Sequence, residues 1–130
     1  MQIPSLAETY ADSFRIGVSL NNGQIAGKNP SVQALIDHQF NTYTAESGMK
    51  WSNIQPSEGV FDFTYADALV ELGERNNATI IGHTLVWHTR TPDWAFQDED
   101  GQPADEVLVL SLLQAHCDAV AGRYAGRIYG

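Results

Sequence analysis

Short apolar runs and amphipathic stretches alternate along the chain. Runs rich in β-branched and aromatic residues predict strands over 14–20 and 40–44, and a third strand with its trailing loop over 78–88. The last residues, 127–130, have the pattern of a fourth strand that has only begun. The strands are separated by stretches long enough to hold helices.

Apolar residues at helical spacing fill those stretches. A capping box of Ser5 and Glu8 predicts a short first helix, and Thr64 can cap another helix. The longest helix is expected over 107–124. The apolar positions that predict the shorter helices are Leu6, Tyr10 and Ala11, then Val32, Leu35 and Ile36, then Ala68, Leu69 and Leu72. Because strand and helix alternate three times, the predicted class is α/β with a parallel sheet.

Turn-forming and acidic residues predict loops between these elements. Residues 21–30 are rich in Asn and Gly, residues 50–63 have no regular period, and residues 97–106 are acidic with Gly and Pro. No low-complexity linker divides the chain, so residues 1–130 are expected to form one unit.

Composition narrows the classes of function. A chain of 130 residues with 43% apolar residues can bury a core, and a net charge of -9 argues against nucleic acid as a partner. No apolar run is long enough for a membrane span. Cys117 is the only cysteine, so no internal disulfide is possible, and its apolar helical surroundings predict a small buried side chain. Residues 1–20 lack a basic segment followed by an apolar one, which predicts no signal peptide in this chain.

Aromatic and imidazole side chains gather where the third strand ends. The stretch GHTLVWHTRTPDW, 82–94, contains His83, Trp87, His88 and Trp94, although the chain has three tryptophans and four histidines in all. Ligands of parallel α/β sheets bind at the carboxyl ends of the strands, which favours a binding site here. Packing of these rings in the core is the alternative. A metal site is disfavoured, because the two histidines are five residues apart and no nearby cysteine or acidic residue has ligand spacing.

Charged groups follow the second strand in the same way. Glu46 and Lys50 lie in FNTYTAESGMKW, directly after that strand, where they would point toward a ligand. Alternatively they form a solvated ion pair of little energetic weight. Aromatic faces together with hydrogen-bonding groups suit a sugar ring, which has an apolar C–H face and equatorial hydroxyls.

These two motifs also carry a family resemblance. FNTYTAESGMKWSNIQPSEGVFDFTYAD followed by GHTLVWHTRTPDW resembles the first part of a glycoside hydrolase family 10 endo-1,4-β-xylanase, and GRYAGRIYG is similar to the segment just before that family's acid/base strand. The resemblance covers nearly the whole chain. It implies an N-terminal fragment of a (β/α)8 TIM barrel, with about the first three β/α units and the start of a fourth strand.

The resemblance also implies roles for individual residues. Glu46 and Lys50 would hydrogen-bond a xylose unit on the glycone side, while His83 and Trp87 would line the subsite at the cleaved bond. His88 would orient its neighbours. The remaining tryptophans, Trp51 and Trp94, would serve packing.

Two positions depart from the family pattern. Ser47 stands where the family usually has Asn, and Arg90 stands where it usually has Gln. Both changes alter the hydrogen bonds offered to a glycone sugar, so Ser47 and Arg90 join the candidate substrate-binding residues. An ion pair between Arg90 and Glu46 is a further expectation.

The resemblance places both catalytic glutamates after Gly130, and no glutamate of this chain matches either motif. The parent enzyme would hydrolyse xylan with retention through two carboxylates about 5 to 5.5 Å apart, so the chain alone is expected to be inactive. No cofactor and no metal are expected for this activity. The parent is expected to be secreted. The alternatives are a non-catalytic fragment that binds xylan or xylo-oligosaccharides and a half-barrel that forms a homo-oligomer, burying its open sheet edges and Ile81 between copies.

Overall fold

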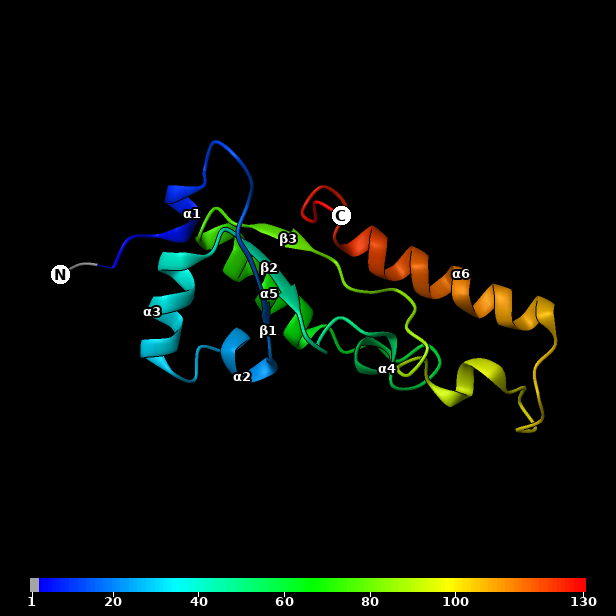
Figure 1. Ribbon diagram of the computed structural model, residues 1–130. Coiled ribbons are helices and arrows are strands. Elements are labelled where there is room, and N and C mark those ends of the chain that lie inside the picture. Colours follow the sequence, from blue (N-terminus) through cyan, green and yellow to red (C-terminus); the bar gives the residue numbers. More distant parts are fainter. Residues whose placement is uncertain (1–2) are drawn as a thin grey trace.

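The computed structural model describes residues 3–130, which form a three-stranded parallel sheet with helices around it (Figure 1). The strands β1 (Gly17–Leu20), β2 (Thr42–Ala45) and β3 (Thr79–Ile81) lie side by side in chain order. The helices are α1 (Leu6–Thr9), α2 (Asn22–Ile25), α3 (Pro30–Gln39), α4 (Trp51–Ile54), α5 (Thr64–Arg75) and α6 (Glu106–Arg123), with a 3-10 turn, η1, at Asp93–Phe96. The predicted α/β class with a parallel sheet is confirmed.

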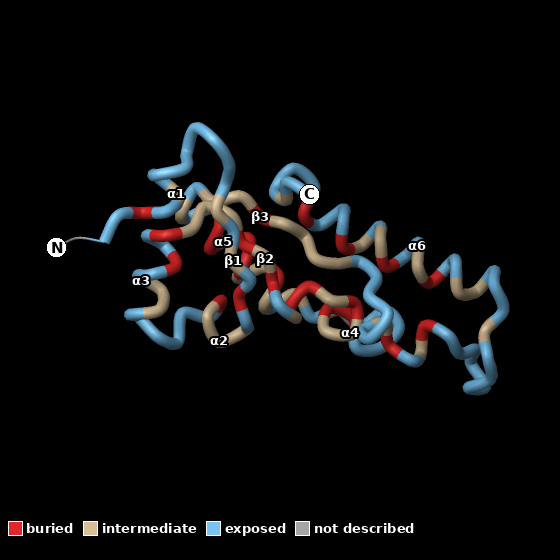
Figure 2. The backbone as a smooth tube through the Cα atoms, in the orientation of Figure 1, coloured by how far each residue is buried: buried red, intermediate tan, exposed pale blue. Residues whose placement is uncertain are grey.

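The two faces of the sheet differ in burial. Side chains alternate between the faces of a strand, and the register pairs Val18 with Tyr43 and Tyr43 with Ile80 on one face. That face is covered, and α5 packs on β2 and β3. Figure 2 shows buried positions on α5, around α4 and at intervals along α6, besides those in the strands. The other face, with Ile81 and a set of small and polar residues, is exposed or half-buried. This set is Gly17, Ser19, Thr42, Thr44 and Thr79.

Helix α5 approaches the sheet closely because it carries a glycine at the contact. A Cβ added at Gly73 would lie 2.3 Å from Cδ1 of Ile80, which is closer than real side chains come. Ile80 is 2% exposed, and Leu69 and Leu72 of the same helix are also buried. Any side chain at position 73 would therefore push α5 away from the core.

A polar cluster joins α5 to the end of α6. The Arg123 guanidinium makes two hydrogen bonds to the Asp67 carboxylate, and the Tyr124 hydroxyl donates to the same carboxylate at 2.8 Å. The hydrogen bonds from Arg123 are the main cause that lowers the pKa of Asp67. Desolvation of its buried ring raises the pKa of Tyr124. These contacts hold α6 against the rest of the molecule, so the segment that follows it returns to β3.

The structure corrects several expected boundaries. Residues 21–30 are not only a turn, because Asn21 and Gln24 form a capping box that begins α2. Likewise α4 lies within 50–63, which was expected to be irregular. The expected first strand is shorter, and Phe63, not Thr64, occupies the N-cap of α5.

The C-terminal segment lies beside β3. Residues 127–130 form no regular strand, but the Tyr129 amide donates to the Ile80 carbonyl at 2.9 Å and the Gly82 amide to the Gly130 carbonyl at 2.7 Å. These bonds put the segment at the position of a fourth parallel strand.

Cys117 is half-buried on α6, and desolvation raises its pKa, so the thiol stays protonated.

Candidate functional site

The loop that follows β3 brings three aromatic side chains together. The rings of His83 and Trp87 meet edge to face with centroids 5.3 Å apart, and His88 lies 4.9 Å from Trp87 on a tilted plane. The peptide bond between His83 and Thr84 is cis. Trp87 is 38% exposed, so part of its indole surface is open to a ligand.

Backbone hydrogen bonds hold Trp87 in place. Its carbonyl accepts from the Arg90 amide at 2.8 Å, the Thr91 amide at 3.0 Å and the Thr91 hydroxyl at 3.1 Å. The Arg90 carbonyl in turn accepts from the Ser52 amide of α4 at 2.9 Å. The loop after β3 is thereby joined to the segment after β2.

Lys50 reaches the same cluster from the second strand. It is the N-cap residue of α4, and its Nζ lies 5.7 Å from the centroid of the Trp87 ring. This is within the range of a cation–π contact. Residues from the loops after β2 and β3 therefore meet at one place, as the carboxyl ends of parallel strands predict.

Glu46 and Ser47 lie on the loop between β2 and Lys50. The Glu46 amide donates to the Leu20 carbonyl at 2.8 Å, and its exposed side chain has no hydrogen-bond partner in the described part of the chain. Ser47 is half-buried and its carbonyl accepts from the Lys50 amide at 3.0 Å. The Glu46 carboxylate is accordingly available to a ligand, whereas Ser47 contacts Lys50 through its backbone carbonyl.

The expected ion pair of Arg90 with Glu46 is wrong. Within residues 3–130 the ion pairs are Arg123 with Asp67 and Arg127 with Glu74. Arg90 is exposed and contacts α4 through its backbone carbonyl, because the turn that closes on Trp87 turns that carbonyl toward the Ser52 amide.

Beneath this surface lies a buried group that sequence analysis missed in part. Trp51 is 2% exposed, stacks on His116 with centroids 4.3 Å apart, and meets Trp94 edge to face at 5.9 Å. Gln55 Oε1 accepts from Trp51 Nε1 and contacts His116 Nδ1, each at 3.1 Å. The two tryptophans pack as the resemblance implied, but nothing in the pattern of the last helix marked His116.

Burial keeps the His116 imidazole neutral. Its side chain is fully buried, and desolvation lowers its pKa to about 4. The Leu85 backbone opposes this shift, although His116 Nε2 has no partner in hydrogen-bond geometry within residues 3–130.

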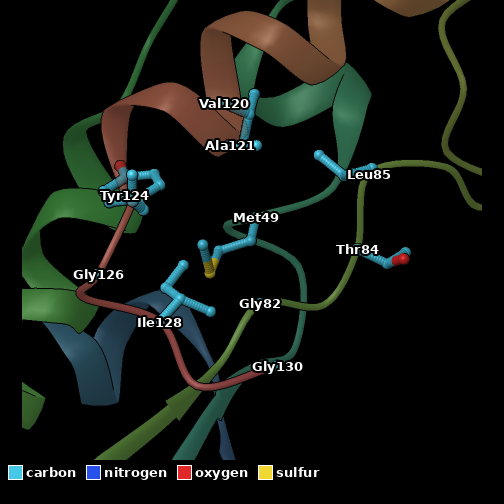
Figure 3. A pocket seen from close by; sticks show the side chains of 11 residues that line it. Met49, Gly82, Thr84, Leu85, Val120, Ala121, Tyr124, Gly126, Ile128 and Gly130 are labelled. Carbon is cyan, nitrogen blue, oxygen red and sulfur yellow. The ribbon is translucent and has the colours of Figure 1, made fainter.

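An apolar cavity borders the loop after β3, but His83, Trp87, Lys50 and Glu46 do not line it. It measures about 280 Å³ and lies between the end of β3, α6 and the C-terminal segment (Figure 3). Met49, Leu85, Val120 and Ile128 line it, with few polar groups. A sugar needs convergent hydrogen-bonding groups, so this cavity is a poorer site than the surface around Trp87.

The arrangement can bind a neutral polyhydroxyl ligand. An exposed indole offers a face to C–H groups, Lys50 and His83 offer polar groups beside it, and Glu46 lies four residues before Lys50 on the loop after β2. The described residues hold no cluster of three or more side chains of the types that ligate metals. None of their helices is both long enough and apolar enough to cross a bilayer.

Curated xylanases are similar to this chain in sequence. The chain is 38% identical to endo-1,4-beta-xylanase B of Paenibacillus barcinonensis over 98% of its length, and 38% identical to a beta-1,4-xylanase of Dictyoglomus thermophilum over 99%. It spans 37% and 34% of the length of these relatives.

Solved structures give the same answer for the fold. A GH10 endoxylanase from a sugarcane soil metagenome superposes with a TM-score of 0.92 at 33% identity, over 98% of this chain and 38% of that one. A Paenibacillus barcinonensis xylanase crystallised with a conduramine derivative gives 0.91 at 37% identity, over 99% of this chain and 38% of that one. This confirms a partial (β/α)8 barrel. The model of glycosyl hydrolase family 10 matches residues 5–130, and the chain belongs to that family.

Proposed function

We propose that the chain forms the glycone-side sugar-binding surface of a retaining endo-1,4-β-xylanase. Its ligands are xylan and xylo-oligosaccharides. Glu46 and Lys50 bind the sugar further from the cleaved bond, and His83 and Trp87 line the subsite next to it. Ser47 and Arg90 adjust the hydrogen bonding at the glycone end.

One observation carries this proposal: Lys50 lies over the exposed ring of Trp87, which also contacts His83. Three side chains from the ends of two neighbouring strands thus share one surface, where an apolar face adjoins hydrogen-bonding groups. Family membership supports xylan as the polymer.

The chain supplies binding groups and not the catalytic pair. Retaining hydrolysis needs an acid/base and a nucleophilic carboxylate about 5 to 5.5 Å apart. The exposed Glu46 has the position of a sugar-binding residue after β2, and no second glutamate follows β3 within residues 82–94. Family membership supports placing both catalytic carboxylates of the parent enzyme outside these residues. The parent enzyme acts on xylan outside the cell.

Tryptophan fluorescence tests the binding surface. Of the three tryptophans, Trp87 is the one whose ring is most open to solvent, so saturable quenching or enhancement by xylotriose is expected in the native chain and not in Trp87→Phe. A response that persists in Trp87→Phe would place the sugar elsewhere.

We also propose that the isolated chain associates with itself. One sheet face is open, and β1 is an edge strand, whereas the outer side of β3 is joined to residues 129–130. Exposed apolar side chains gather on α1, α3 and the segments beside them: Ile3 at 69%, Leu6 at 44%, Phe14 at 56% and Leu35 at 53%. The open sheet face itself is mostly polar apart from Ile81, so this second region offers more apolar area for an interface.

A further inference from the structure

The directions of the hydrogen bonds determine which ring nitrogen of His116 carries the proton in the buried group of Trp51, Gln55 and His116. An indole N–H can only donate, so the Gln55 atom facing Trp51 Nε1 at 3.1 Å must be the carbonyl oxygen. His116 Nδ1 contacts the same oxygen at 3.1 Å and must therefore carry a proton. With a neutral ring, Nε2 carries none. Gln55 Oε1 thus accepts two hydrogen bonds at a position that is 4% exposed.

The same group determines the position of α4. This helix has four residues, and its N-cap side chain makes no capping hydrogen bond. So short a helix has little stability of its own, and its orientation depends on tertiary contacts. Trp51 supplies one through its stack on His116, with ring planes 11° apart, and Gln55, the C-cap residue of α4, supplies another by accepting from His116 Nδ1.

Helix α4 connects this group to the candidate sugar surface by two short paths. Lys50 precedes Trp51 directly and extends over the Trp87 ring. Ser52 follows Trp51 directly, and its amide binds the Arg90 carbonyl of the Trp87 loop at 2.9 Å. A rotation of Trp51 would consequently move both partners of the Lys50–Trp87 contact.

We propose that His116 is a positioning residue for xylan binding: its Nδ1–H, through Gln55 and Trp51, sets the placement of Lys50 against Trp87. His116 is fully buried and touches no sugar. The effect of His116 on sugar binding rests on the proposed function, but the coupling of His116 to Trp87 can be measured without any sugar.

Indole N–H signals in nitrogen-15 spectra of the chain test the coupling. The three tryptophans give three signals, assigned by replacing each with Phe in turn. His116→Phe keeps a ring to stack on Trp51 and removes the donor to Gln55. His116→Asn keeps a donor at the place of Nδ1. We expect the Trp51 and Trp87 signals to shift in the Phe variant. In the Asn variant the Trp87 signal is expected to return toward its native position, whereas the Trp51 signal also reports the loss of the stacked ring.

A variant of the same helix separates positioning from general loss of packing. Leu112 lies one turn before His116 and is 9% exposed. Leu112→Ala is expected to lower the unfolding midpoint while the Trp51 and Trp87 signals stay in place. The proposal is overturned if the Trp87 signal stays in place in His116→Phe, if His116→Asn fails to restore it, or if Leu112→Ala moves it equally.

Xylotriose titration of the same samples tests the consequence for binding. Loss of one buried hydrogen bond corresponds to about a fivefold higher Kd in His116→Phe, and His116→Asn is expected to recover native affinity. Unchanged affinity in His116→Phe would overturn the proposal. If the native chain gives no response to xylotriose, the proposed function fails, while the sugar-free spectra still decide whether His116 positions Trp87.

Discussion

The ammonium group of Lys50 lies 5.7 Å from the centroid of the Trp87 ring. Lys50 follows β2 and Trp87 follows β3, so the contact joins the ends of two neighbouring strands. A cation beside a half-open indole keeps both groups ordered before a ligand arrives, which lowers the entropy cost of binding. The candidate surface is therefore partly preorganised.

Removing either partner should weaken sugar binding more than folding. Trp87→Ala and Lys50→Ala delete partly exposed groups, so we expect a clear rise in the Kd for xylobiose with little change in the thermal midpoint. Trp51→Ala removes a buried ring and is expected to destabilise the chain by about 3 to 5 kcal/mol. Calorimetric titration and thermal unfolding of the three variants check this. Equal loss of stability in all three would mean that these residues serve packing alone.

The chain on its own should not hydrolyse xylan. Without the acid/base and nucleophilic carboxylates, both steps of a retaining mechanism lose their catalyst. Reducing-sugar release from soluble xylan should equal that of a buffer blank, with a full-length family member as the positive control. Turnover by a pure sample that is free of host xylanase, with no second chain present to supply carboxylates, would contradict the proposed division of roles.

His116 should make stability depend on pH in a defined window. Burial lowers its pKa from 6.5 to about 4, so between these values the unfolded chain binds a proton that the folded chain excludes. The free energy of unfolding should fall as the pH decreases from 6.5 to about 4, by up to roughly 3 kcal/mol from this group. Above pH 6.5 the group contributes no slope. Urea unfolding at several pH values across this range should show a weaker dependence of the unfolding free energy on pH in His116→Phe. The same pH dependence in both proteins would refute the assignment.

Self-association should depend on exposed apolar side chains. Light scattering after size exclusion is expected to give a mass above the 14.3 kDa of one chain. Ile81→Ser tests the interface on the open sheet face, and Leu35→Glu tests the region of α1 and α3. The variant that restores the single-chain mass identifies the interface. A native chain that stays monomeric and unfolds cooperatively at micromolar concentration would exclude both.

The spacing of apolar residues and the sequence motifs were sufficient to predict most of the architecture. The spacing of Leu69 and Leu72 predicted a helix that buries this face, and the apolar run ending in Ile81 predicted β3. The short helices α2 and α4 were missed because four residues contain barely one turn and show no period. Asn21 and Gln24 did carry a capping-box signal for α2.

The candidate site was predicted by position along the chain, and its contacts were not. Lys50, His83 and Trp87 each followed a predicted strand, so their meeting at one edge of the sheet was expected. The stack of Trp51 on His116 joins residues 65 positions apart, and one buried histidine on a helix has no distinguishing pattern. The wrong Arg90–Glu46 pair came from charge alone, since sequence does not show which way an exposed side chain points.

Calorimetric titration of the native chain with xylotriose, alongside maltotriose as a control of equal length, tests the central claim most directly. If Glu46, Lys50, His83 and Trp87 form a xylan-binding surface, xylotriose should give a saturable heat that Trp87→Ala abolishes or weakens at least tenfold, about 1.4 kcal/mol. Maltotriose should give none. Equal binding of both sugars, or xylotriose binding unchanged in folded Trp87→Ala, would contradict the account.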